Sequence, residues 1–262
     1  MLNRFEVYGS WLREDPAGFG VYILCFAVTM LASLILHECA HGYVALRCGD
    51  PTAKMMGRLS LNPAKHLDPV GTLFMVVLGF GWAKPVPVNP RNYRNYRRDE
   101  YLVSVAGITV NLALFLSSTF LGVMCCRLMM GADWFEGSTV MERATLYTNV
   151  RSIILYGGAT LPANLAGMMA APWLQYPVRV FGMLTQMNLA LAIFNLLPIP
   201  PLDGWRLANN ALKGRLSTNP QMLRAMQAAL TILCLTGFLG RGLGTVVSAV
   251  DGAVVKALMY LV

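Results

Sequence analysis

The residues with the clearest chemical meaning are His37, Glu38 and His41, which form the pattern H-E-x-x-H. On a helix, this spacing places two imidazoles one turn apart on one face, where both can reach a single zinc ion. The carboxylate beside the first histidine can then serve as general base toward a zinc-activated water. The chain has only 3 histidines among 262 residues, so a chance match is expected in fewer than about one in a thousand such chains. A pair of core histidines with a buried, satisfied glutamate is the alternative interpretation.

The motif lies inside an apolar run from Val21 to Leu46, which is long enough to cross a bilayer. The chain is 56% hydrophobic and 13% charged, with a mean hydropathy of +0.52, whereas soluble proteins carry about 25% charged residues. The composition therefore predicts an all-α polytopic membrane protein embedded in the lipid bilayer. The net charge of +8 is interpreted as basic loops that face an anionic leaflet. No nucleic acid is expected as a partner, because the basic residues are not interleaved with aromatic ones.

The hydropathy pattern predicts a multi-helix bundle with a re-entrant and extended segment between its first two spans. The apolar segment Val70–Trp82 has only 13 residues, too few to span, so we predict that it is re-entrant. The proline-rich segment Lys84–Asn89 follows it and is predicted to be extended. Two further segments, Ile153–Trp173 and Leu243–Val262, are ambiguous between spanning and interfacial placements. The predicted spans are Val21–Leu46, Tyr101–Met124, Val178–Leu197 and Ala225–Gly240.

The basic residues orient these segments. Nine lysines and arginines flank Val70–Trp82 on its two sides, and a re-entrant placement keeps all of them cytoplasmic, as the positive-inside rule prefers. The first span then runs from outside to inside. If Ile153–Trp173 does not span, the helix Val178–Leu197 delivers Asp203 to the same side as the histidines; if it spans, Asp203 lies opposite. We prefer the first arrangement.

A catalytic zinc site needs a third protein ligand. The remaining histidine, His66, lies in a basic loop, and among the 13 acidic residues only Glu38, Asp203 and Asp251 lie in or at the end of strongly apolar segments. Asp203 is favoured because Pro198–Pro201 break the helix before it, and unwound backbone can turn a carboxylate toward a cavity. A turn aspartate without ligand function has similar weight at this point. Asp251 is interpreted as an interfacial charge.

The two motifs together resemble the site-2 protease family of intramembrane zinc metalloproteases. The H-E-x-x-H pattern is followed by Asn195-x-x-Pro198-x-x-x-Leu202-Asp203-Gly204, and the resemblance covers roughly Leu31–Leu207. The stretches Gly57–Leu73 and Gly81–Asn92 look like those of small bacterial and archaeal members without a PDZ domain. The resemblance implies one peptidase domain over residues 1–262, with a catalytic core at about 20–210 and C-terminal helices at 221–262.

The same resemblance implies that His37, His41 and Asp203 bind one Zn²⁺ per chain and that Glu38 is the catalytic acid/base. It also implies a G-x-x-x-N element, matched by Gly107 to Asn111, although Ile108 stands where many members carry proline. Asn111 and Asn195 are candidate contacts for the substrate or the oxyanion. Hydrogen bonding between helices is at least as good an interpretation of both asparagines.

The expected reaction is hydrolysis of a peptide bond in or near a transmembrane segment of a membrane-protein substrate, in regulated intramembrane proteolysis. The expected location is the bacterial inner membrane, with the active site toward the cytoplasm. The extended Lys84–Asn89 segment is a candidate for holding an unwound substrate by strand addition; a rigid connecting loop is the equal alternative. The six cysteines show no C-x-x-C spacing and predict neither a disulfide framework nor a zinc knuckle.

Two other classes of function compete with the peptidase. A membrane metal transporter or non-hydrolytic metal-binding scaffold would use His37, His41 and Asp203 without needing Glu38. An inactive relative that binds transmembrane segments is a further alternative, but the complete set of three ligands and a glutamate argues against it, because such groups are costly in a membrane.

Overall fold

The structure is a computed structural model that describes residues 2–78, 83–134, 136–216 and 219–261. Every regular element in these ranges is a helix, which confirms the predicted all-α class. The chain divides into two compact units that alternate along the sequence. Unit 1 holds Met1–Met30, Leu114–Met187 and Thr245–Val262, and unit 2 holds Leu31–Ala113 and Asn188–Gly244. The single peptidase domain and its core at about 20–210 stay predictions.

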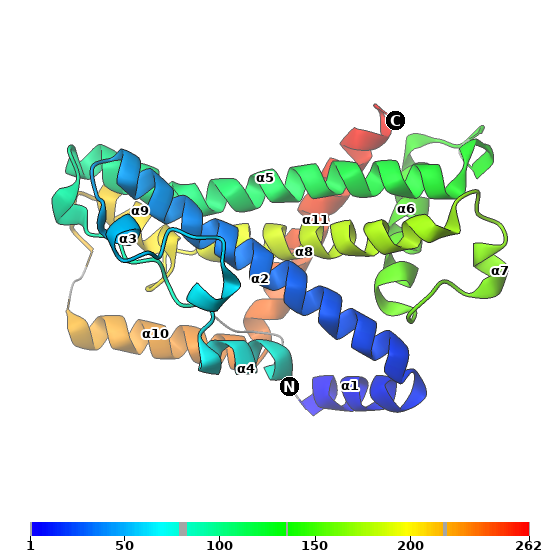
Figure 1. Cartoon of the computed structure of the whole chain (residues 1–262), viewed down its shortest axis with the longest axis horizontal. Coiled ribbons are helices and arrows are strands. Elements are labelled where there is room, and N and C mark those ends of the chain that lie inside the picture. The colour runs from blue at the N-terminus through cyan, green and yellow to red at the C-terminus, as the bar shows by residue number, and fades with distance from the viewer. Residues whose placement is uncertain (1, 79–82, 135, 217–218, 262) are drawn as a thin grey trace. The chain divides into compact units, whose positions relative to one another are not determined.

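Four helical stretches are long and apolar enough to cross a membrane, as expected for a polytopic membrane protein. They are α2 (Pro16–Arg47), α5 (Tyr96–Met130), the stretch Pro172–Asn195 that ends in α8 (Gln175–Asn195), and α11 (Phe238–Met259) (Figure 1). The other helices are α1 (Leu2–Glu14), α3 (Thr52–Met55), α4 (Pro69–Leu78), α6 (Val140–Tyr156), α7 (Ala163–Ala166), α9 (Asp203–Ala211) and α10 (Pro220–Leu235), with single-turn 3-10 helices at Pro63–Lys65, Pro90–Asn92, Ala132–Trp134 and Pro172–Leu174.

The last span differs from the sequence prediction. The apolar run Ala225–Gly240 is not one helix, because α10 ends at Leu235 after 16 residues and Gly237 takes a φ of 73°. A glycine with positive φ is a common helix terminator. Instead α11 begins at Phe238 and has the length to span, so the segment predicted at Leu243–Val262 starts earlier and is the fourth candidate span.

The two short apolar segments contain no helix with the length of a span in the described residues, and the preferred topology stays a prediction. Within Ile153–Trp173 the chain completes α6, forms α7 and begins a 3-10 turn, and none of these pieces has the length of a span. Helix α4 has 10 residues, of which all but Pro69 fall within the predicted re-entrant segment, and its described length is also too short for a span; residues 79–82 of that segment lie outside the described residues. The segment Lys84–Asn89 forms neither helix nor strand.

Unit 1 has an apolar core where α5, α6, α8 and α11 pack together, with Val123, Tyr147, Ile154, Val178 and Val255 among its buried members. A charged pair lies beside this core. Asp251 is not the interfacial charge that the sequence predicted; it is only 7% exposed and accepts hydrogen bonds from both Nη1 (3.3 Å) and Nη2 (2.5 Å) of Arg151. The partner lies 100 residues away in sequence, so no local pattern indicates it.

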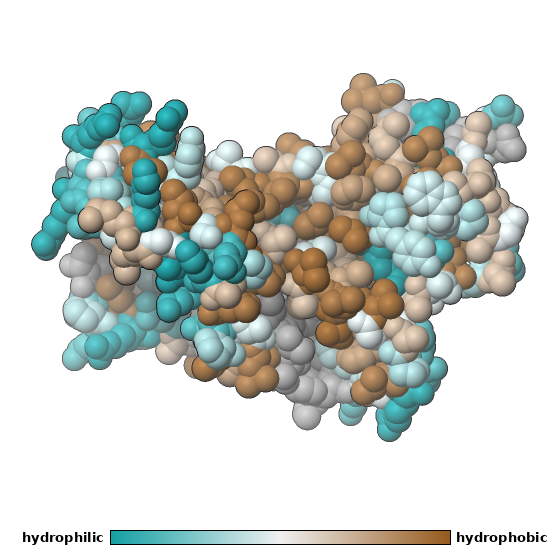
Figure 2. Space-filling view, in the orientation of Figure 1, coloured by the Kyte–Doolittle hydropathy of each residue, from teal (hydrophilic) through white to brown (hydrophobic). Residues whose placement is uncertain are grey.

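Unit 2 packs the end of α2 against the start of α5 through Ala45, Cys48, Tyr93 and Val103. On the face shown in Figure 2, hydrophilic side chains gather around the end of α2 and α3, whereas hydrophobic side chains follow the middle of α2. That distribution fits a helix whose middle contacts lipid and whose end lies in the interface. All six cysteines are free thiols, as the sequence indicated.

Candidate metal centre

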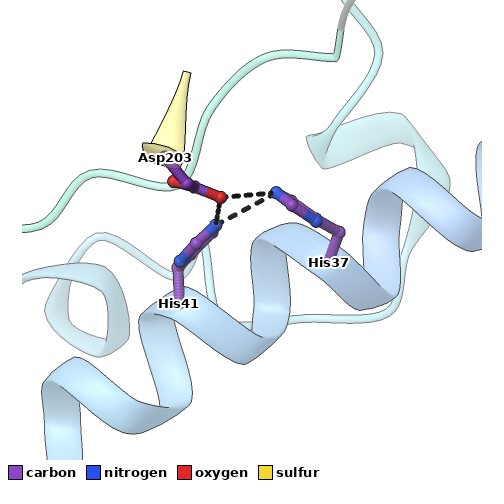
Figure 3. A group of neighbouring side chains, drawn as sticks. All are labelled: His37, His41 and Asp203. Carbon is purple, nitrogen blue, oxygen red and sulfur yellow. Dashed lines mark hydrogen bonds and ion pairs between the residues drawn. The ribbon is translucent and has the colours of Figure 1, made fainter. Parts of the chain in front are cut away.

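Helix α2 presents His37 and His41 one turn apart, and both imidazoles are buried. Their Nε2 atoms lie 3.0 Å from each other. The carboxylate of Asp203 completes a triangle, because its Oδ2 lies 3.3 Å from His37 Nε2 and 3.1 Å from His41 Nε2. Figure 3 shows the three side chains converging from α2 and from the start of α9.

Asp203 reaches the histidines because the chain reverses between α8 and α9. Helix α8 ends at Asn195, and α9 begins at Asp203 itself. Gly204 makes this reversal possible: a Cβ at this position would lie 2.3 Å from the carbonyl oxygen of Leu196. The aspartate also occupies the first turn of α9, where the helix dipole favours a negative charge.

The three atoms are arranged to bind a metal ion, because each of them can donate a lone pair to it. All lie within 4.8 Å of one another, close enough to reach one zinc at the bond lengths of about 2.0–2.2 Å that imidazole and carboxylate ligands require. Asp203 Oδ2 is buried without a hydrogen-bond partner in the described chain, and such a group costs free energy unless a cation or donor compensates it.

The surroundings of His41 leave Nε2 free to bind a metal. Its Nδ1 lies 2.7 Å from the carbonyl oxygen of Val103 in α5, and a carbonyl can only accept. The Nδ1–H therefore donates to Val103, and the neutral imidazole carries its lone pair on Nε2. A hydrogen bond of this kind fixes the tautomer and the ring plane of many metal-binding histidines.

Asn111 gives His37 a comparable partner. Its Nδ2 lies 3.1 Å from His37 Nδ1, and its Oδ1 is buried with no hydrogen-bond partner in the described residues. A half-turn of the amide exchanges these two atoms. In that orientation Oδ1 accepts the Nδ1–H of His37 and gains a partner, and the lone pair of His37 moves to Nε2. Asn111 thus lies against a histidine; its predicted oxyanion or substrate contact stays a prediction.

Gly107 leaves the space that the two imidazoles occupy. A Cβ on this residue would lie 2.4 Å from His37 Cε1 and 2.6 Å from the Nε2 atoms of both His37 and His41. Real Cβ atoms do not approach other atoms so closely, so any larger residue would displace the rings. The G-x-x-x-N spacing therefore places a gap and a polar partner one turn apart on the face of α5 that meets the histidines.

Glu38 has a different hydrogen-bond partner from His37 and His41. Its Oε2 accepts a hydrogen bond of 2.8 Å from the backbone N–H of Val86, and its side chain is half-buried. Val86 belongs to the extended segment Lys84–Asn89. The segment that the sequence singled out as a possible substrate edge thus already gives one of its N–H groups to the predicted acid/base.

A partly buried ion pair links α9 to α5. One turn after Asp203, Arg206 donates from Nε to Glu100 Oε1 (2.9 Å) and from Nη2 to Glu100 Oε2 (3.1 Å). Such a two-bonded pair is geometrically specific. Burial disfavours the charged guanidinium, but Glu100 outweighs it and raises the pKa of Arg206. The pair therefore holds the helix that carries the third predicted ligand.

Two residues considered from the sequence have hydrogen-bond partners outside the triangle. Asn195 donates from Nδ2 to the carbonyl oxygen of Leu191 in its own helix, and its predicted role stays a prediction. His66 is fully buried and lies with Nε2 2.6 Å from the carbonyl oxygen of Ser60. Within the described chain, the one group of three or more potential metal ligands is formed by His37, His41 and Asp203.

Sequence reasoning missed the residues that support the site. Val86 and Val103 act through backbone atoms, which any residue type offers, so their side chains carry no signal. Glu100 and Arg206 are charged residues close to apolar segments, and a charge in such a place costs free energy, which is the signal that could have identified them. The sequence gives no signal that these two residues pair with each other.

The comparisons with known proteins agree on one family. The model of the family described as Peptidase family M50 matches residues 25–239. A protein of Bacillus subtilis (strain 168) named "Putative zinc metalloprotease YwhC" is 40% identical over 180 residues, which cover 69% of this chain and 65% of the relative. A protein of Mycobacterium tuberculosis (strain H37Rv) named "Putative zinc metalloprotease Rip2" is 28% identical over 234 residues, which cover 86% of this chain and 71% of the relative. The match thus spans slightly less than two thirds of the Bacillus relative. No solved structure matches the chain significantly.

Proposed function

The chain belongs to peptidase family M50, and from this premise we propose that it is a zinc endopeptidase that cleaves a membrane-protein substrate in or near a transmembrane segment, in regulated intramembrane proteolysis. The observation that carries the proposal is the buried triangle of two imidazole nitrogens and one carboxylate oxygen, with Glu38 next to the first histidine. Three protein ligands and an open position are typical of catalytic zinc sites, whereas structural sites use four.

The residues of the site would have two roles in the proposed reaction, metal binding and proton transfer. His37, His41 and Asp203 would hold one zinc ion, which would supply Lewis acidity and lower the pKa of water to about 7. Glu38 keeps Oε2 on the Val86 N–H and uses Oε1 to take the proton of the attacking water. It then passes that proton to the leaving amine. The sequence-adjacent position of Glu38 and His37 keeps the base close to the metal throughout.

The substrate class follows from where the histidines lie along the chain. They are in the second half of α2, a helix with the length and hydropathy of a span, so a peptide bond must come to them at or near the membrane. The basic residues of the connecting loops support a site on the cytoplasmic side, because the positive-inside rule favours cytoplasmic loops rich in lysine and arginine. We propose the bacterial inner membrane as the location on the basis of the bacterial relatives.

The proposed strand addition on Lys84–Asn89 needs a more selective test than proline at either valine. Proline at position 86 would also remove the hydrogen bond to Glu38. Proline at position 88 changes the edge without touching that bond, because Val88 is two residues further along. Wild-type cleavage by Val88→Pro would therefore show that the segment is a connecting loop and not a docking edge.

The decisive experiment measures zinc content and cleavage of a transmembrane test substrate in detergent for the wild type and Glu38→Gln. We expect stoichiometric zinc in both proteins and cleavage that falls by about 10²–10⁴-fold in the variant, the range of general acid–base catalysis. Cleavage at the wild-type rate in Glu38→Gln would exclude the peptidase. Zinc binding in both proteins with cleavage in neither would favour the transporter or metal-binding scaffold, which has no use for the glutamate.

A further inference from the structure

The segment Lys84–Asn89 is held at its first residues by a partly exposed arginine, Arg58. Arg58 donates from Nη2 to the carbonyl oxygens of both Lys84 (2.9 Å) and Pro85 (3.1 Å). The N–H of Lys84 donates to the carbonyl oxygen of His66 at 2.8 Å. The backbone before Val86 is thereby fixed on two sides.

The other end of the segment is held by Asp50, whose side chain is fully buried. Oδ2 of Asp50 accepts the backbone N–H of Asn89 at 2.6 Å. Oδ1 accepts the Thr52 N–H (3.1 Å), the Thr52 hydroxyl and Nδ2 of Asn92 (2.8 Å). Burial opposes ionisation, but these donors outweigh it and lower the pKa of Asp50. The carboxylate is thus an acceptor for the extended segment on one oxygen and for its own turn on the other.

Val86 lies between the two anchors and has little freedom of its own. It is flanked by Pro85 and Pro87, which fix φ and lack an N–H, so Val86 offers the one N–H between Lys84 and Val88. Its side chain is buried against Gly42 of α2, where an added Cβ would lie 2.9 Å from Val86 Cγ1. The N–H that remains is the donor to Glu38.

We infer that Asp50 and Arg58 are positioning residues for the proposed reaction: they hold Lys84–Asn89 so that the Val86 N–H orients the carboxylate of Glu38. This inference rests on the proposed peptidase function. A glutamate side chain has three rotatable bonds, and a general base must stay within hydrogen-bond reach of the proton that it abstracts. A rigid backbone donor removes that freedom on one oxygen and aims the other, which is how supporting contacts keep a catalytic group in its productive geometry.

The substitution Asp50→Asn tests the link to the segment. The amide oxygen can stay with the three donors of Thr52 and Asn92, which places the NH₂ group against the N–H of Asn89, donor against donor. The matched control is Thr52→Val, which removes a hydrogen bond to the other oxygen of Asp50 and leaves the bond to Asn89 in place. A second variant, Arg58→Lys, keeps the positive charge but loses the planar guanidinium that reaches two carbonyl oxygens.

The experiment compares hydrogen exchange of residues 84–89, zinc content, kcat and KM in the purified full-length protein. Pro85 and Pro87 carry no exchangeable amide, so the peptide reports mainly on Val86 and its near neighbours. We expect Asp50→Asn to exchange faster in this segment and to lose about 10–100-fold in kcat, the effect of a small misplacement of a catalytic group, with zinc content unchanged. Arg58→Lys should do the same to a smaller extent, and Thr52→Val should match the wild type.

Three results would overturn the inference. They are faster exchange with unchanged kcat, a lower kcat with unchanged exchange, and an equal loss of kcat in Thr52→Val. Failure of the proposed function is distinguishable from all three, because then the wild type itself cleaves nothing, while the exchange data still report whether Asp50 and Arg58 hold the segment.

Discussion

Unit 1 and unit 2 each contain a buried cluster of ionisable side chains, and the two clusters differ in whether side chains of the protein supply the opposite charge. In unit 1, Arg151 and Asp251 are 4% and 7% exposed, form two hydrogen bonds, and the guanidinium lies over the ring of Tyr147 at 5.1 Å from its centroid. Burial disfavours the charged guanidinium, yet Asp251 outweighs it and raises the pKa of Arg151. In unit 2, the side chains of His37, His41 and Asp203 are equally buried, yet three lone-pair atoms face one another and Asp203 Oδ2 has no hydrogen-bond donor in the described residues.

The comparison separates a structural charge cluster from one built for a ligand. A buried ion pair contains its own counter-charge, so adding anything to it gains nothing. Three Lewis bases around one point lack a positive charge, and the free energy of that deficit is recovered only when a cation binds. Burial and charge alone therefore do not identify a ligand-binding site. A buried polar group without a hydrogen-bond donor or counter-charge does.

The largest effect is expected from removing the acid of the incomplete cluster. Asp203→Ala deletes one of the three proposed ligands, so zinc binding and zinc-dependent cleavage should both be lost. The reason is that two histidines alone do not make a catalytic zinc site. Metal analysis and cleavage assays on the purified variant test this prediction. Full zinc content in Asp203→Ala would mean that another residue is the third ligand.

Removing the acid of the complete cluster should lower the stability of the fold and leave zinc binding unchanged. Asp251→Ala leaves Arg151 buried without a partner and should lower the free energy of unfolding by about 3–5 kcal/mol, with zinc binding unchanged in the folded protein. Replacing both partners, as Arg151→Met with Asp251→Leu, should restore most of the stability, since a buried pair exchanged for apolar side chains is often neutral. Unfolding followed in detergent and metal analysis give the two readouts. Loss of zinc in folded Asp251→Ala would end the contrast between the clusters.

The incomplete cluster was largely predictable and the complete one was not. His37, Glu38 and His41 are close in sequence, and one helical turn brings the two histidines together, so their spacing alone indicates a site. Asp203 had only even weight from the residues themselves, and the resemblance to a family raised it. Asp251 was interpreted as interfacial because its partner Arg151 lies on another helix.

The fold shows the same limit. Hydropathy located α2, α5 and α8, whose apolar runs are continuous, but it merged the end of α10 with the start of α11. The helix boundary there depends on the conformation of Gly237, and glycines are tolerated inside the neighbouring spans as well. A single residue that changes φ leaves almost no trace in a hydropathy average, whereas it decides which stretch is long enough to span.

Gly107→Ala should weaken zinc binding more than it weakens the fold. The added methyl group would lie 2.4–2.6 Å from both imidazoles and force them apart, which we expect to lower zinc affinity about 100-fold, at the upper end of what supporting contacts contribute. Alanine favours a helix over glycine by roughly 1 kcal/mol, which offsets part of the about 1–3 kcal/mol cost of crowding the buried rings, so the metal-free variant should lose little stability. Zinc titration and thermal unfolding of the metal-free proteins measure the two effects. Thr109→Ala, an exposed change on the same helix, is the control; unchanged zinc affinity in Gly107→Ala would show that the imidazoles need no such space.

Substitutions of Asn111 should have the smallest effect on zinc affinity. The sign of that effect depends on whether His37 donates a hydrogen bond to the Asn111 amide or accepts one from it. If the Nδ1–H of His37 donates to the amide oxygen when zinc binds, Asn111→Leu removes the acceptor and should lower zinc affinity about 10-fold. Asn111→Asp keeps an acceptor at the same position and should retain or improve the affinity, because a carboxylate behind a metal-binding histidine raises the basicity of the ring. Zinc titrations of the two variants against the wild type decide between these outcomes. Equal losses in both would mean that Asn111 contacts His37 only as a donor, and the incomplete cluster would then lack one of the supports that set it apart from the ion pair in unit 1.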